Sequence, residues 1–197
     1  EKLQKIRKMS GKCDTHGIND DLINNFLEND PFLSMAIDEA ERNFHDLINE
    51  LGEQLISLDE IELVKSVQHD FVNFYNPSTV NPYVAIAARG PWIITSHGAV
   101  IHDNGGYGML GMGHGPEDVI ISMQKNWVMA NVMTPSFSQK RLAQKLREEV
   151  GFSRGHCPFH KFICLNSGTE SVAISMRIAD LNAKIATGEG GIHQGKP

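Results

Sequence analysis

The first third of the chain has apolar residues at helical spacing. Over residues 20–75 they recur every three or four positions, which is typical of helices that bury one face. Asp30 before Pro31 predicts a helix start, because Asp is a favoured N-cap and Pro is favoured in the first turn. Ser57 and Glu60 predict a second start with a capping box. The positions expected to face the core of the first helix are Phe32, Met35, Ala36, Ala40, Phe44, Leu47, Ile48 and Leu51.

The pattern changes after Asn76-Pro77. Residues 83–103 contain short apolar and β-branched runs separated by Arg-Gly-Pro and Ser-His-Gly, which predicts strands joined by tight turns. Residues 104–115 hold six glycines, too many for a regular element. Pro116 and Glu117 then predict a helix start, and a further helix is expected from about residue 138 to 150.

A strand, a turn and a helix start are predicted at residues 161–170. The run KFICL (161–165) predicts a buried parallel strand, and a helix is expected to begin within two residues of Thr169. The turn between them has two readings. Ser167 and Glu170 can form a capping box, or the free N–H groups and hydroxyls of the turn can bind an anion such as phosphate. Strand, turn and helix in this order predict an α/β domain with a mostly parallel sheet.

The amino-acid composition limits the classes of partner that are expected for this chain. The 197 residues are 41% hydrophobic and 21% charged, with a formal net charge of −6, and the only basic run is KLQKIRK near the start. Nucleic acid is therefore not an expected partner, since binding its backbone needs clustered Lys and Arg. No apolar run has the length of a membrane span, and no signal-peptide pattern is present. Three scattered cysteines, Cys13, Cys157 and Cys164, indicate a reducing, cytoplasmic setting.

Two stretches together resemble one enzyme family. GPWIITSHGAVIHDNGGYGMLGMGHGPEDVIISMQ (90–124) resembles the entry pattern of class III, fold-type-I aminotransferases, which use pyridoxal 5′-phosphate. LNSGTESVAISMRIAD (165–180) is similar to the phosphate-binding turn of that family. The resemblance covers about residues 83–182. Gly113-His114-Gly115-Pro116 lacks the second His that is usual there, and Ser96-His97-Gly98 lacks an acidic residue before its glycine.

The resemblance implies a fold and a function. Residues 1–78 are expected to form a helical N-terminal region from their apolar spacing alone, and they receive nothing from the resemblance. After a small β-rich and Gly-rich segment (79–115), the resemblance implies that residues 116–197 are the first part of a cofactor-binding α/β domain. The family moves an amino group between an amine donor and a keto acid or aldehyde, and its members are homodimers. The cofactor phosphate would be held by Ser167, Gly168 and Thr169.

The resemblance also implies what these residues do not supply. The lysine that forms the Schiff base lies far downstream of the phosphate turn in this family. Lys184 and Lys196 are the only lysines after Gly168, and neither has a suitable position. The catalytic lysine is therefore expected beyond Pro197, and the chain alone, as the N-terminal part of the enzyme, is expected not to transaminate.

Other residues are weaker candidates. Ser136 and Phe137 stand where this family often lines the substrate side, and His114 could approach the active site or be structural. Asp103 is expected to fix a turn. HCPFH (156–160) has metal-ligand residue types, but no second ligand pair accompanies it, so a polar loop is expected.

Two other functions remain open from the sequence. The chain could bind phosphate or cofactor without catalysis, or residues 1–78 could form a helical interaction module while the glycine motifs only shape turns.

Overall fold

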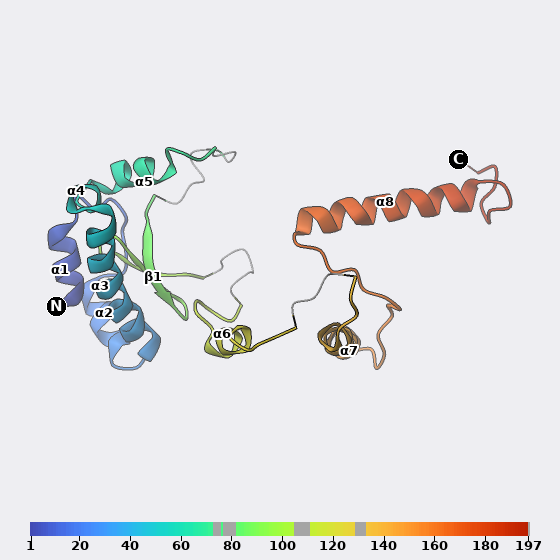
Figure 1. Ribbon diagram of the computed structural model, residues 1–197, viewed down its shortest axis with the longest axis horizontal. Coiled ribbons are helices and arrows are strands. Elements are labelled where there is room, and N and C mark those ends of the chain that lie inside the picture. Colours follow the sequence, from blue (N-terminus) through green and yellow to red (C-terminus); the bar gives the residue numbers. More distant parts are fainter. Residues whose placement is uncertain (73–75, 77–81, 105–110, 129–132, 197) are drawn as a thin grey trace. The chain divides into compact units, whose positions relative to one another are not determined.

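The computed structural model describes residues 1–72, 76, 82–104, 111–128 and 133–196. It divides into two compact units, residues 1–127 and 128–197 (Figure 1). Together they give a mixed helical structure with a small three-stranded antiparallel sheet, broadly of the α/β class. The helical region and the β-rich segment expected from the sequence share one core in the first unit, because helix α3 (Pro31–Leu51) packs against strands β1 (Ala85–Arg89) and β2 (Trp92–Thr95).

The first unit begins with helices, as the apolar spacing predicts (Figure 1). They are α1 (Lys2–Met9), α2 (Asp20–Leu27), α3 (Pro31–Leu51), α4 (Glu53–Ile56) and α5 (Glu60–Gln68). The predicted start of α3 is confirmed: the Asp30 carboxylate accepts a hydrogen bond from the Phe32 N–H at 2.9 Å, and Pro31 occupies the first turn. Asp30 also accepts a hydrogen bond from the Trp92 indole N–H at 2.7 Å, so one side chain joins α3 to the sheet.

The buried face of α3 differs in part from the predicted one. Its buried side chains are Leu33, Ala36, Ile37, Ala40 and Phe44. Phe32, Met35 and Leu51, which the sequence placed in the core, are each about half exposed. Both sets have helical spacing, and α3 packs against α1, α2, α4 and the sheet. The elements that pack around the helix therefore select its buried face.

The sheet has three strands in the order β1 (Ala85–Arg89), β2 (Trp92–Thr95) and β3 (Val100–His102). Both strand pairs are antiparallel. The two predicted tight turns are confirmed, and Gly90 (φ 52°) and Gly98 (φ 71°) supply the positive φ angles that side chains disfavour. The sheet buries Ile86, Ala87, Trp92, Ile94 and Val100 in the same core as α3.

The predicted capping box at Ser57 and Glu60 is wrong. Ser57 follows α4, and Asp59 precedes α5 without a side-chain cap. The Glu60 carboxylate instead accepts hydrogen bonds from the backbone N–H groups of Asp14 and Thr15. Glu60 therefore bonds to backbone N–H groups that are distant in sequence, and not to that of Ser57 as the capping box requires.

The glycine-rich segment leads into α6 (Glu117–Met123), the last helix of the first unit. Its start after Pro116 confirms the predicted one, although the helix ends before the apolar pattern does. Residues 105–110 of the glycine-rich segment lie outside the described residues.

The second unit contains α7 (Phe137–Gly151) and α8 (Gly168–Thr187). The helix expected from about residue 138 to 150 is confirmed, and Ser136 caps it in a full capping box with Gln139. The predicted strand at 161–165 is wrong: the segment has no regular structure, and Ile163 and Leu165 are exposed. A parallel strand needs a neighbouring strand for its N–H and C=O groups, and no strand occurs among the residues described in this unit.

Apolar side chains of the second unit remain largely uncovered. Among its described residues only Gly151 is buried, whereas the first unit buries a continuous apolar cluster. Along α8 the exposed apolar side chains are Val172, Met176, Ile178, Leu181 and Ile185. In the described chain, no helix has the length and apolarity needed to cross a membrane.

Candidate functional site

The turn at residues 166–170 is built by Ser167. Its backbone is extended (φ −146°, ψ 158°), and its hydroxyl oxygen accepts a hydrogen bond from the Glu170 N–H at 3.2 Å. The Ser167 carbonyl accepts the first bond of the helix, from the Ser171 N–H at 3.1 Å. Helix α8 thus begins at Gly168, which confirms the predicted start near Thr169.

The reciprocal half of the predicted capping box is displaced by one residue. One carboxylate oxygen of Glu170 accepts a hydrogen bond at 3.0 Å from the N–H of Asn166, the residue before the N-cap. Glu170 therefore fixes the approach of the chain to the helix. It leaves the N–H groups of Gly168 and Thr169 to other acceptors.

Those two N–H groups make the turn suitable for an anion. Within the part of the chain that the structure describes, neither donates a hydrogen bond to a protein acceptor. A Cβ at position 168 would meet no atom within 4 Å, so the backbone there is open to close approach. Free N–H groups at a helix N-terminus, together with the helix dipole, favour negative charge. The hydroxyls of Ser167 and Thr169 add donors, so the residues present fit a phosphate group.

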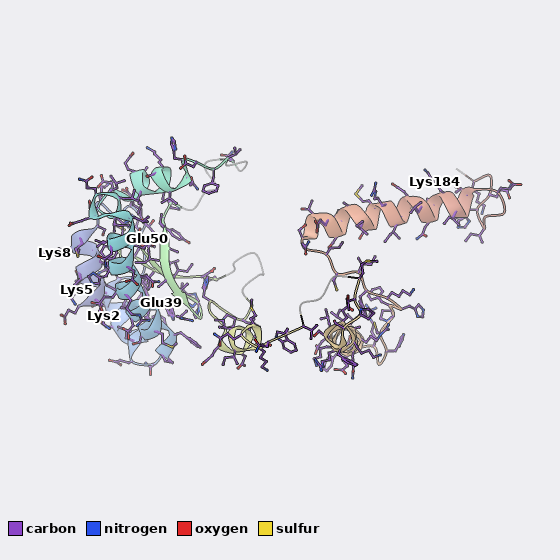
Figure 2. All side chains as sticks on the ribbon, viewed as in Figure 1. Lys2, Lys5, Lys8, Glu39, Glu50 and Lys184 are labelled. Carbon is purple, nitrogen blue, oxygen red and sulfur yellow. The ribbon has the colours of Figure 1, made fainter. Side chains whose placement is uncertain are left out.

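The two lysines that follow this turn in the sequence are not placed to reach a cofactor that it holds. Figure 2 shows Lys184 on the C-terminal half of α8. At the rise of an α-helix it stands about 24 Å from Gly168, much farther than a lysine side chain extends. Lys196 lies beyond the end of α8, near the C-terminus.

The first unit brings the side chains of His114 and Asp103 together. His114 Nε2 lies 3.0 Å from a carboxylate oxygen of Asp103, and both side chains are about one-fifth exposed. The backbone of His114 pairs with Gly90 in both directions, and the Asp103 N–H donates to the Pro91 carbonyl at 2.7 Å. These contacts join Asp103 to His114 and to Pro91, and the expectation that Asp103 fixes a turn stays a prediction. Asp103 and His114 both line a cavity of about 1160 Å³ whose apolar walls include Phe32 of α3.

The family resemblance implies that Ser167 and Thr169 face the same pocket as the end of the glycine-rich segment near His114. His114 belongs to the first unit and Ser167 and Thr169 to the second, and each unit is described by itself. The shared pocket therefore stays a prediction. Ser136 acts as the N-cap of α7 and Phe137 is exposed, and their substrate-side role also stays a prediction.

The HCPFH segment forms a loop held by α7. Arg147 donates hydrogen bonds to the carbonyls of Phe159 and His160, and its guanidinium lies 5.4 Å from the Phe162 ring centre. The described residues contain no group of three or more His, Cys, Asp or Glu side chains that could hold a metal ion. Nothing in the sequence pattern singled out Arg147, because its partners are backbone carbonyls.

The basic run near the N-terminus contacts acidic side chains of the same unit. Lys2 lies 2.7 Å from Asp38, and Lys5 lies 2.9 Å from Glu41 (Figure 2 labels both lysines). The hydrogen bond to Asp38 raises the pKa of Lys2, and the hydrogen bond from Lys5 lowers the pKa of Glu41. Arg7 likewise contacts Asp20 at 2.8 Å. These cations are matched within the chain.

Two pKa shifts accompany partial burial in the first unit. Burial raises the pKa of the Cys13 thiol, and the negative charge of Glu60 raises it further. Burial also raises the pKa of Tyr83, with a smaller effect from Asp103. Both groups therefore keep their protons at neutral pH, and neither has the lowered pKa of an activated nucleophile.

No family model, no curated protein and no solved structure matches this chain. The geometry of the Ser167–Thr169 turn is thus the main support for a functional assignment.

Proposed function

We propose that this chain supplies the phosphate-binding turn of a pyridoxal-phosphate-dependent aminotransferase of the class III type. The observation that carries the proposal is the start of α8 at Gly168, where two backbone N–H groups have no protein acceptor in the described chain and no side chain blocks approach. When bound, the cofactor would supply an electron sink for amino-group transfer.

Each residue of the turn has a distinct part in holding the phosphate. The Ser167 oxygen already accepts the Glu170 N–H, so its hydroxyl proton is left to donate to a phosphate oxygen. Gly168 and Thr169 offer their N–H groups, and Thr169 adds a hydroxyl. The proposal assigns no Schiff-base lysine to these 197 residues, so their contribution is to bind and orient the phosphate end.

The finer parts of the proposal follow from the family resemblance. An amine donor and a keto acid or aldehyde would be the substrates, and the complete enzyme would be a homodimer. A cytoplasmic setting is part of the proposal, supported by three cysteines that are all free thiols. A helical interaction module has less support, because the buried face of α3 is occupied by the chain's own sheet.

The test is binding of pyridoxine 5′-phosphate to the full chain, because this probe has no aldehyde to react with surface lysines. Gly168→Asp places a carboxylate where the phosphate would bind and should weaken binding about tenfold or more. Ser175→Asp is the matched control, since it adds the same charge within the same helix. Equal binding by the two variants would refute the phosphate site.

Two further measurements separate the enzyme from the alternative. If inorganic phosphate binds as tightly as pyridoxine 5′-phosphate, the turn is a general phosphate site and the non-catalytic alternative is favoured. Incubation with pyridoxal 5′-phosphate, borohydride reduction and mass spectrometry should show scattered, substoichiometric labelling of lysines. Stoichiometric labelling of one lysine with turnover of an amine donor would contradict the assignment of the catalytic lysine.

A further inference from the structure

The Glu60 carboxylate is fully buried at the start of α5. One of its oxygens, Oε2, accepts hydrogen bonds from the backbone N–H groups of Asp14 (2.8 Å) and Thr15 (2.7 Å). Two consecutive backbone N–H groups thus meet at one carboxylate oxygen. The polar chemistry of Glu60 is therefore directed at the segment between α1 and α2.

Two polar atoms at this contact have no partner. Glu60 Oε1 and Thr15 Oγ1 are both buried, and neither makes a hydrogen bond to any residue that the structure describes. They belong to residues already joined by the 2.7 Å bond from the Thr15 N–H to Glu60 Oε2. Buried polar atoms without partners are rare and costly, and an internal water commonly satisfies them.

We propose that one internal water molecule bridges Glu60 Oε1 and Thr15 Oγ1. The water would donate one hydrogen bond to the carboxylate and exchange a second with the hydroxyl. Water fits better than a metal ion, because the described residues hold no cluster of three or more metal-ligating side chains. The two oxygens make no direct hydrogen bond to each other.

The proposed water would add to other hydrogen bonds that hold residues 11–18 against the rest of the unit. The Lys12 carbonyl accepts from the Glu60 N–H at 3.0 Å, and the Ile18 N–H donates to the Val100 carbonyl at 2.8 Å. A Cβ at Gly11 would lie 2.5 Å from the Leu58 carbonyl oxygen, so this segment lies directly against the chain before α5. The water would thus add one more hydrogen-bonded contact to those that fix the position of α1 relative to α5 and β3.

The proposal is tested by whether one substitution lowers or raises the folding equilibrium constant. Thr15→Val keeps the side-chain shape and removes only the hydroxyl. If the water bridges the two oxygens, the variant loses a hydrogen bond and its folding equilibrium constant falls about fivefold. If Thr15 Oγ1 has no partner, removing it relieves an unsatisfied group and the constant stays the same or rises, which would overturn the proposal. Thr95→Val is the reference, since the Thr95 hydroxyl oxygen is buried and accepts the Ala99 N–H at 3.0 Å.

A crystal structure of the full chain gives the direct readout. The expected result is a density peak within hydrogen-bond distance of both oxygens in the wild-type protein that is absent from the Thr15→Val variant. No peak in the wild type would overturn the proposal. A peak with short metal–oxygen distances, or stability that depends on which monovalent cation is present at constant ionic strength, would replace the water with a bound ion and equally overturn it.

Discussion

Asp30 makes the sharpest stability prediction, because one carboxylate serves two elements. One oxygen caps α3 through the Phe32 N–H, and the other accepts the indole N–H of Trp92, whose side chain is 1% exposed. Asp30→Ala removes both acceptors. Asp30→Ser keeps a good N-cap and removes only the partner of Trp92.

The magnitudes follow from the two contacts. Loss of an N-cap costs about 1 kcal/mol. Leaving the buried indole N–H without its charged acceptor costs about 1.5–3 kcal/mol. Asp30→Ser is therefore expected to lower the free energy of unfolding of the first unit by about 1.5–3 kcal/mol. Asp30→Ala should lower it by about 2.5–4 kcal/mol, since both terms are then lost.

Urea denaturation followed by tryptophan fluorescence measures both values. The background is Trp127→Phe, which leaves Trp92 as the only tryptophan and replaces a side chain that is 45% exposed. Adding Trp92→Phe closes a double-mutant cycle, read by circular dichroism, that isolates the Asp30–Trp92 interaction. If Asp30→Ser is as stable as the parent, the indole contact contributes nothing and the reasoning is refuted. If the Ala and Ser variants are equally destabilised, the capping part is refuted.

Three further predictions concern groups in the same unit. Burial and a neighbouring carboxylate raise the pKa of Cys13, so its thiol should react more slowly with iodoacetamide at pH 8 than that of Cys164. Peptide mapping would measure the two rates, and faster labelling of Cys13 would contradict the prediction. Because the hydrogen bond from Lys5 lowers the pKa of Glu41 in the folded state, its contribution to stability is present at neutral pH and is lost as the pH falls through that lowered pKa. Glu41→Gln should therefore reduce stability at pH 7 and show a smaller loss on acidification than the parent, in urea titrations at both pH values. Gly113→Ala should destabilise the unit by at least about 1 kcal/mol, since φ is 76° and a Cβ would lie 2.9 Å from Gly90 Cα; an unchanged urea midpoint would show that this backbone is free to adjust.

The sequence alone determined the features that depend on neighbouring residues. The starts of α3 and α8 were readable because Asp30 and Ser167 bond to N–H groups two and three residues later. The turns at Gly90 and Gly98 were readable because a positive φ is a property of a single residue. The candidate phosphate turn belongs to this class, since its donors all lie within consecutive residues.

The tertiary structure decided whatever depends on residues far apart in the chain. Spacing predicted Phe32 and Met35 in the core, whereas the helices and strands packed around α3 bury Leu33 and Ile37. Glu60 looked like half of a capping box until the segment before α2 offered its carboxylate two N–H groups. Residues 161–165 have the composition of a strand and form none, because a strand exists only where another strand completes its hydrogen bonds. Local hydrogen bonds are written into short stretches of sequence, whereas burial and pairing require the folded chain to bring their partners together.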